Sequence, residues 1–259
     1  MTILHFGDLP TTKELFYEQL VNSPPPEVSV DIETISLKER MPIGFGIAVS
    51  PREAWYFTCH PEHDPEIELV LPLLRNPKVK KVFHNAPFDL RGFPLIADID
   101  STNIADTNVM ARLLGRTETK LTVLGLEEFG IEGLTSAQEM LKGGKTMLDI
   151  PHDEVAKHCA KDCQLTIALY HKYIDSINPE YFAVEMEAIP ILIAMSLRGL
   201  KINQQDRMDV QIRLEQEVEY YRRICEEYDF NPASNQQVGY TLTNRFSVIL
   251  MDFYFHKRN

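Results

Sequence analysis

The segment VSVDIET at residues 28–34 constrains the fold more than any other part of the chain. Its alternating β-branched residues indicate a strand. Asp31 and Glu33 are two residues apart, so on a strand both carboxylates point to one face while the aliphatic side chains point to the other. Neighbouring carboxylates repel each other unless a cation lies between them, and a divalent metal held by oxygen ligands is the usual solution. A strand with a solvated acidic face is the alternative, and this segment alone does not decide between them.

The first part of the chain alternates between strand and helix patterns. Besides the acidic strand, strands are expected at residues 3–6, 43–49, 54–57 and 79–83, and helices at residues 66–74, 88–96, 106–114 and 121–129. From Pro151 to Ile174, apolar residues recur at spacings of three and four, which predicts one long helix. His158 and Asp162 lie one turn apart on a common edge of that helix.

The character of the sequence changes after residue 178. No strand pattern follows, and two long helices are expected before an apolar, aromatic and then basic tail at residues 246–259. We therefore place a domain boundary at this point. The sequence predicts an α/β domain at residues 1–178 and a helical appendage with an atypical tail at residues 179–259.

The charge of the chain limits the kinds of partner that it can bind. The 259 residues carry a formal net charge of −12. This argues against a sequence-independent duplex binder with a broad basic surface. It does not exclude a nucleic-acid enzyme, because bound metal ions reverse the local charge in the site. We see no secretion signal and no apolar segment of membrane-spanning length, so we expect a cytoplasmic protein with no membrane partner.

The four cysteines give no sign of a zinc site or a disulfide framework. They form no CxxC pair and lack the ligand spacing of structural zinc sites. Cys159 and Cys163 lie one helical turn apart, and we expect them to be small residues of the core. An intracellular, reducing compartment is the expectation.

Three acidic motifs occur far apart in the sequence. They are VSVDIET at residues 28–34, HNAPFD at residues 84–89 and HCAKDC at residues 158–163. In this order they resemble the motifs of the DEDD 3′–5′ exonucleases, and most closely those of the proofreading domain of family A DNA polymerases. The resemblance covers the first 178 residues and continues weakly into residues 181–240, which look like the start of a polymerase thumb.

The resemblance implies a fold, a metal centre and roles for four acids. The fold would be RNase H-like, with a mixed sheet flanked by helices and followed by an all-α appendage. Two Mg²⁺ or Mn²⁺ ions would lie roughly 3.5–4 Å apart. Asp31 would bridge both ions, Glu33 and Asp162 would bind the ion that holds the attacking water, and Asp89 would support the other ion through water. A phosphodiester is anionic, so its hydrolysis needs positive charge at the attacking and leaving oxygens.

Position 158 departs from the pattern of that family. Its polymerase-type subgroup has Tyr four residues before the last Asp and another subgroup has His five residues before it, whereas this chain has His at the Tyr spacing. A neutral imidazole accepts a proton near neutral pH, while a phenol mostly orients its partner. We therefore predict that His158 contacts the nucleophilic water as an orienting group or general base. A partly buried histidine without such a role is the alternative.

Four further residues are candidates for substrate contacts. Thr34 and Asn85 match family positions near the 3′-terminal nucleotide, and Leu37 would wedge against the terminal base. Phe88 belongs to the same set. Each has a structural alternative, namely a strand residue for Thr34, a turn residue for Asn85, and core packing for Leu37 and Phe88.

The expected activity is metal-dependent 3′–5′ exonucleolytic hydrolysis at single-stranded DNA 3′ ends, releasing nucleoside 5′-monophosphates. A local groove with a few stacking contacts suits a single strand better than a broad basic face does. The alternatives are an RNase D-like enzyme that acts on RNA and an inactive module that binds a 3′ end or a partner protein. No polymerase palm or fingers can fit after residue 240, so we expect either a free-standing exonuclease, for which a separate polymerase partner is possible, or a truncated relative of a polymerase.

Overall fold

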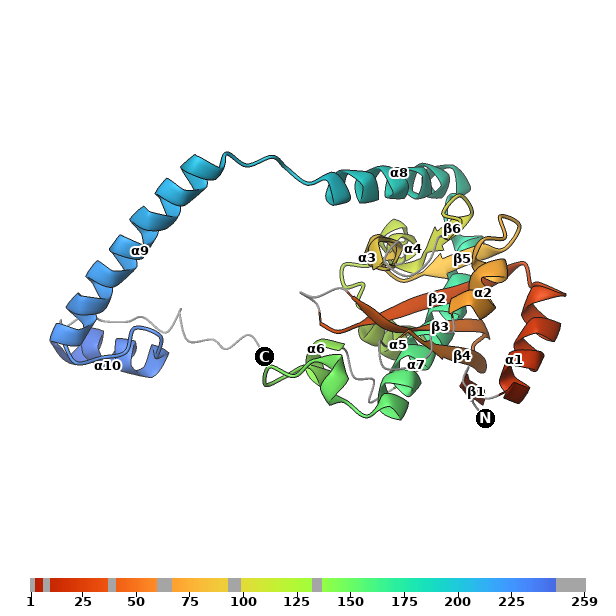
Figure 1. Cartoon of the computed structure of the whole chain (residues 1–259), viewed down its shortest axis with the longest axis horizontal. Coiled ribbons are helices and arrows are strands. Elements are labelled where there is room, and N and C mark those ends of the chain that lie inside the picture. Colours follow the sequence, from red (N-terminus) through yellow and green to blue (C-terminus); the bar gives the residue numbers. More distant parts are fainter. Residues whose placement is uncertain are drawn as a thin grey trace. The chain divides into compact units, whose positions relative to one another are not determined.

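The structure is a computed structural model that describes residues 3–6, 10–36, 41–59, 67–92, 99–131 and 137–245. Leu37 and the tail at residues 246–259 lie outside the described residues. The chain forms two compact units, Met1–Arg198 and Gly199–Asn259 (Figure 1).

A six-stranded mixed sheet is the centre of the first unit. Its order is β1-β4-β3-β2-β5-β6. The strands are β1 (Ile3–Phe6), β2 (Glu27–Thr34), β3 (Pro42–Ser50), β4 (Glu53–Thr58), β5 (Lys80–Phe83) and β6 (Ile104–Asp106). The acidic strand β2 lies inside the sheet, antiparallel to β3 and parallel to β5. The predicted fold class, an RNase H-like mixed sheet flanked by helices and followed by further helices, is confirmed.

Helices cover both faces of this sheet (Figure 1). They are α1 (Pro10–Phe16) with a π-helical turn (Tyr17–Val21), α2 (Ile67–Leu74), α3 (Ala86–Gly92), α4 (Thr107–Leu113), α5 (Leu121–Phe129), α6 (Ala137–Met140), α7 (His152–Tyr173) and α8 (Pro179–Arg198). Val30 and Ile32 of β2 pack into a core cluster with residues of α1, α2 and α3. Met110 of α4 and Leu124 of α5 belong to a cluster with α7. Because side chains alternate along a strand, Asp31 and Glu33 turn away from the first cluster and toward α7.

Helix α7 lies close against the middle of the sheet. The hydroxyl of Ser29 on β2 donates a hydrogen bond to the Cys163 carbonyl oxygen on α7 at 2.7 Å. On β3, a Cβ atom at Gly46 would lie 2.9 Å from the Cys159 sulfur and 2.8 Å from the Cys163 sulfur. The absence of a side chain at Gly46 therefore allows the helix to approach, and it brings the residues of α7 within reach of the acidic strand.

Helix α8 belongs to the first unit. Its residues Phe182 and Ile189 are buried in the two core clusters of that unit. The second unit contains α9 (Gln204–Glu227) and α10 (Asn235–Arg245). Contacts thus divide the chain after Arg198, whereas the change in sequence character falls near residue 178, and the thumb-like role of residues 179–259 stays a prediction. Among the described helices, none has the length and apolar character needed to cross a membrane.

Strand β6 was not predicted from the sequence. We expected a helix at residues 106–114, but residues 104–106 form strand β6 and the helix begins at Thr107. This strand pairs with β5 alone, at an edge of the sheet. Three residues are too few to show an alternating pattern, so the strand depends on its neighbour rather than on a local signal.

Candidate active site

Both acids of β2 lie opposite glycines of β3. Asp31 pairs with Gly46 and Glu33 pairs with Gly44 in the antiparallel register. A side chain at Gly44 would overlap the hydroxyl group of Tyr56. The two glycines therefore leave space beside the two carboxylates for groups from β4 and α7.

Asp89 reaches the same place from α3. Strand β5 pairs with β2 only as far as Ser29, so the N–H group of Ile32 has no partner from that strand. The carboxylate of Asp89, which is 1% exposed, accepts a hydrogen bond from this N–H group at 3.1 Å. Because Ile32 lies between Asp31 and Glu33, this bond brings a third carboxylate to the two acids of β2.

Helix α7 contributes His158 and Asp162. The Nδ1 atom of His158 lies 3.0 Å from Oε1 of Glu33 and 3.7 Å from Oδ2 of Asp162. A carboxylate oxygen accepts hydrogen bonds, so the Nδ1–H group of His158 is assigned as the donor of a hydrogen bond to Glu33. In the neutral ring, Nε2 is then the acceptor nitrogen. The structure therefore brings together all five residues that the sequence proposed as catalytic: Asp31, Glu33, Asp89, His158 and Asp162.

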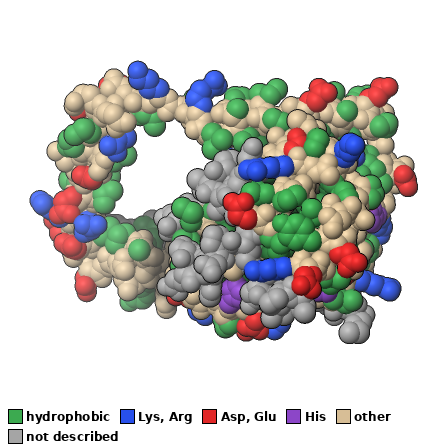
Figure 2. Space-filling model, turned by 45° about the vertical axis from the view of Figure 1, so that its right-hand side comes forward, with side chains coloured by type: hydrophobic (Ala, Val, Ile, Leu, Met, Phe, Trp, Pro, Cys, Tyr) green, Lys and Arg blue, Asp and Glu red, His purple; other side chains and the backbone are tan. Residues whose placement is uncertain are grey.

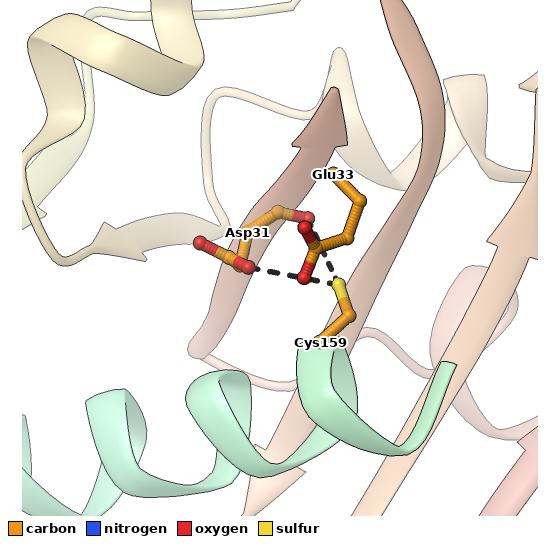
Figure 3. Close-up of side chains that lie close together, drawn as sticks. All are labelled: Asp31, Glu33 and Cys159. Carbon is orange, nitrogen blue, oxygen red and sulfur yellow. Dashed lines mark hydrogen bonds between the residues drawn. The ribbon is translucent and has the colours of Figure 1, made fainter. Parts of the chain in front are cut away.

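Cys159 is a site residue that sequence reasoning missed. It is buried as expected, but its sulfur lies 3.6 Å from Oδ2 of Asp31 and 3.6 Å from the Asp31 carbonyl oxygen. One potential ligand atom each from Asp31, Glu33 and Cys159 lies within 4.8 Å of the others (Figure 3). A signal in the sequence could have found it. Cys159 directly follows His158 and precedes Asp162 by three residues, which places it on the side of α7 that faces the acids.

Burial and mutual repulsion raise the pKa values of Asp31, Asp89 and Asp162. Burial, followed by the negative charge of Asp89, raises the pKa of Asp31 well above its usual range. Burial also raises the pKa of Asp89, although the N–H group of Ile32 partly opposes this. For Asp162, burial raises the pKa to about 7, and the nearby His158 works in the opposite direction. Charge repulsion of this kind is relieved when a cation binds among the acids.

The comparisons with known proteins agree with this geometry. The profile of a 3′–5′ exonuclease family, that of the family A DNA polymerases, matches residues 9–177. The chain belongs to this exonuclease family. It is also 25% identical to the DNA polymerase I of Chloroflexus aurantiacus over 245 aligned residues, with 86% of this chain and 26% of that polymerase covered. The chain thus spans about a quarter of the length of this relative.

Solved structures of other proteins show the same fold as this chain. Brucella melitensis NrnC has a TM-score of 0.59 and 17% identity, with 77% of this chain and 95% of that chain covered. The catalytic core of RRP6 from Trypanosoma brucei, as the mutant C496S, has a TM-score of 0.57 and 18% identity, with 73% of this chain and 52% of that chain covered. RNase D from the same organism has a TM-score of 0.55 and 12% identity, with 73% of this chain and 71% of that chain covered.

The donor atoms of the site fit the divalent metal that DEDD exonucleases use. Asp31 and Glu33 offer carboxylate oxygens, which are the ligands that Mg²⁺ prefers. The carboxylates of Asp89 and Asp162 do not belong to the tightest group of potential ligand atoms in the described part of the chain, but their charges act on Asp31. Among these residues, a bound cation would supply the positive charge that phosphodiester hydrolysis requires.

We predict that the metal-free protein loses stability as the pH rises. The carboxyl group of an unfolded Asp ionises near its usual pKa of 3.8, whereas burial raises the pKa of folded Asp162 to about 7. Between these values the folded protein holds a proton that the unfolded chain has released. The free energy of unfolding should therefore fall as the pH rises from about 4 to about 7, by up to about 1.4 kcal/mol per pH unit for each such proton.

Urea unfolding in EDTA across this pH range measures the effect. Asp162→Asn removes one contributing carboxylate, so its slope should be shallower than that of the wild-type protein. Mg²⁺ should restore more stability near pH 7 than near pH 4, because protons compete with the cation at low pH. Equal slopes for the wild-type and variant proteins would show that Asp162 does not hold a proton in the folded state.

The carboxylate of Asp106 connects the turn before Asp89 to the start of α4 through hydrogen bonds. Its Oδ2 accepts a hydrogen bond from the N–H group of Ala86 at 2.8 Å, and its Oδ1 accepts one from the N–H group of Asn85 at 3.0 Å. The same Oδ1 accepts the N–H group of Asn108 at 2.8 Å and so caps α4. Asn85 has a φ angle of 77°, in the left-handed region that most residues avoid. Asp106 holds this conformation and with it the start of α3, which carries Asp89.

We predict that Asp106→Ala lowers the free energy of unfolding by about 2–3 kcal/mol, through the lost cap and the lost charged hydrogen bonds. The Mg²⁺-dependent rate should fall as well, because Asp89 is then less firmly placed. Asp149→Ala is the matched control, since the carboxylate of Asp149 also accepts a backbone hydrogen bond, from Thr146, but in an exposed turn. Urea unfolding and digestion rates for both variants measure the difference, and equal effects on both would contradict this role for Asp106.

The candidate substrate residues lie in different settings. Thr34 is buried at the end of β2, and its hydroxyl donates a hydrogen bond to the Ser36 carbonyl oxygen at 3.1 Å. Asn85 is exposed in the turn before α3. Phe88 is half-buried against the first core cluster. Leu37 lies outside the described residues, and the contacts of all four residues with a substrate stay predictions.

Proposed function

We propose that this exonuclease uses two divalent ions, Mg²⁺ or Mn²⁺, to hydrolyse the terminal phosphodiester bond at the 3′ end of single-stranded DNA. Nucleoside 5′-monophosphates are the products. The observation that carries the proposal is the meeting of Asp31, Glu33, Asp89 and Asp162 with His158, from β2, α3 and α7. Five residues from three distant segments gather around one potential metal site, which unrelated surface acids would not do.

In this proposal each of the five site residues has a role. Asp31 would hold both ions, Glu33 and Asp162 would hold the ion nearer the attacking water, and Asp89 would support the other ion through water. Bound cations supply positive charge for the attacking and leaving oxygens. The Nδ1–H group of His158 donates a hydrogen bond to Glu33, which orients the ring, and Nε2 is then the nitrogen that would accept a hydrogen bond from the water.

A single strand suits the charge distribution of the protein. On the face in Figure 2, the Lys and Arg side chains lie singly among Asp and Glu rather than in one broad basic patch. Such a surface offers little non-specific attraction to a duplex. It leaves local contacts near the site to hold the 3′ end, as single-strand binders do with stacking and a few phosphate contacts.

DNA is favoured because the match to a DNA polymerase I covers 86% of this chain and so extends beyond the exonuclease domain. RNA is the second candidate substrate, because RNase D and RRP6 are among the similar structures. One NrnC structure contains Mg²⁺ and another contains pGG. These likenesses are below 25% identity and rest on the fold, so they carry less weight.

Digestion of 5′-labelled DNA and RNA single strands of one sequence tests the proposal. We expect a ladder that shortens from the 3′ end with Mg²⁺ or Mn²⁺, no ladder with EDTA, and faster digestion of DNA. Chromatography of the products should show nucleoside 5′-monophosphates. Faster digestion of RNA would establish the second candidate substrate, and binding of either strand without digestion would indicate a 3′-end-binding module.

A further inference from the structure

The sulfur of Cys159 lies among the carboxylates of the proposed metal site. It lies 3.6 Å from Oδ2 of Asp31, and ligand atoms of Cys159, Asp31 and Glu33 all lie within 4.8 Å of one another. Figure 3 shows the two carboxylates reaching from β2 toward the sulfur on α7. One cation can span the 3.6 Å between the sulfur and Oδ2 of Asp31, because a metal–oxygen bond of about 2.1 Å and a metal–sulfur bond of about 2.3 Å together reach about 4.4 Å. The carboxylate of Glu33 is close enough to reach the same ion with a small side-chain movement.

The site thus combines hard and soft ligand atoms. Two carboxylates alone favour Mg²⁺ or Mn²⁺, whereas a thiolate favours zinc and other thiophilic ions. We propose that Asp31, Glu33 and Cys159 form a site for a thiophilic divalent cation, which excludes Mg²⁺ and thereby inhibits the enzyme. The inhibition rests on the proposed function, whereas the binding rests on the geometry of the three ligands.

The location of the thiol is fixed by its neighbours. Gly46 lies opposite Asp31 on β3, and a Cβ atom at this position would lie 2.9 Å from the Cys159 sulfur. The glycine therefore provides the space in which the sulfur lies beside Asp31. Cys163 is equally buried and one turn further along α7, but it does not belong to the ligand group in the described part of the chain.

Binding is a ligand exchange without any redox change. The thiol of Cys159 releases its proton to the solvent, a sulfur–metal bond forms, and the ion gives up water molecules to the three protein ligands. Mg²⁺ gains nothing from the sulfur, because it prefers oxygen ligands and strict octahedral geometry. A thiophilic ion therefore binds more tightly than Mg²⁺, and the two compete because they share Asp31 and Glu33.

Titration of the full-length protein with Cd²⁺ tests this assignment. Cadmium bound by a thiolate gives a sulfur-to-metal charge-transfer band in the ultraviolet, which oxygen ligands do not give. We expect the wild-type band to rise with Cd²⁺ and to fall when excess Mg²⁺ is added. The band should persist in Cys163→Ala, the matched control from the same helix, and in a variant that lacks the two remaining cysteines, Cys59 and Cys225.

Two variants of Cys159 separate binding from folding. Cys159→Ala and Cys159→Ser should both lose the band. Both variants should also bind Cd²⁺ at least about tenfold more weakly, because the loss of a second-shell partner already weakens metal binding by about 10–100-fold and the loss of a ligand should weaken it no less. Circular dichroism melting shows whether each variant is folded. A wild-type band that survives in a folded Cys159 variant, or no band in the wild-type protein, would overturn the proposal.

The same samples distinguish this inference from the proposed function. Digestion with Mg²⁺ in a protein that gives no Cd²⁺ band would support the exonuclease activity and refute the metal site at Cys159. A band that depends on Cys159 without any Mg²⁺-dependent digestion would support the thiol site and refute the exonuclease. Digestion that continues while the band is saturated would show that the ion does not exclude Mg²⁺, which contradicts the inhibition.

Discussion

Asp31→Asn should reduce Mg²⁺-dependent digestion by roughly 10³-fold or more, because it removes the carboxylate that would hold both ions in the proposed function. An amide has nearly the same shape but no negative charge, so the change tests charge rather than space. In the metal-free protein, burial raises the pKa of Asp31 well above its usual range. Neutralising this residue should therefore leave the metal-free protein as stable as the wild type or more stable.

The prediction is specific because activity should fall while the stability of the metal-free protein stays the same or rises. Asp153→Asn is the matched control, because Asp153 is an exposed acid on α7 that pairs with Lys157 and lies outside the site. Digestion of single-stranded DNA and thermal unfolding in EDTA should be measured for both variants. An Asp31→Asn protein that digests DNA at the wild-type rate, or that loses activity only because it unfolds, would contradict the proposed role.

The acids of β2 could be predicted from the sequence because their signal is local. The period of two along a strand places Asp31 and Glu33 on one face, whatever the rest of the chain does. The same holds for His158 and Asp162, which lie one turn apart on a helix with a clear apolar stripe. Patterns of this kind are set by the geometry of single elements, and the structure has them as expected.

The other features depend on contacts between elements that no local pattern encodes. Asp89 joins the site because β5 stops pairing with β2 after Ser29, which leaves an N–H group for its carboxylate. The sequence indicates only that Cys159 is a core residue. Its sulfur lies beside Asp31 because Gly46, which leaves space for it, is paired with Asp31. The sequence indicates that Asp106 is the first residue of a helix, yet its carboxylate also accepts hydrogen bonds from the turn before α3. The sequence placed Asp89 in the site only through its resemblance to a family motif, and for Cys159 and Asp106 the missing information was the register of one element against another.

His158→Ala should lower the Mg²⁺-dependent rate by roughly 10²–10⁴-fold, the range that is typical of a lost general base. The geometry supports this role, since the bond from Nδ1 to Glu33 fixes the ring and leaves Nε2 as an acceptor. Mg²⁺ binding should change far less than the rate, because the four carboxylates are still present. Single-turnover digestion at saturating Mg²⁺, together with a separate Mg²⁺-binding measurement, gives both quantities.

His158→Tyr distinguishes an orienting group from a base. A phenol ionises near pH 10 and an imidazole near pH 6.5, so a phenol can hold the water near neutral pH but accepts its proton poorly. If orientation is the main role, Tyr should restore most of the rate that Ala loses, as expected from the Tyr at this spacing in the polymerase-type subgroup. If proton transfer is the main role, Tyr should remain near the rate of Ala and its rate should rise more steeply with pH. A wild-type rate in His158→Ala would show that the water is activated without this residue, and that His158 serves only to pack α7 beside Glu33.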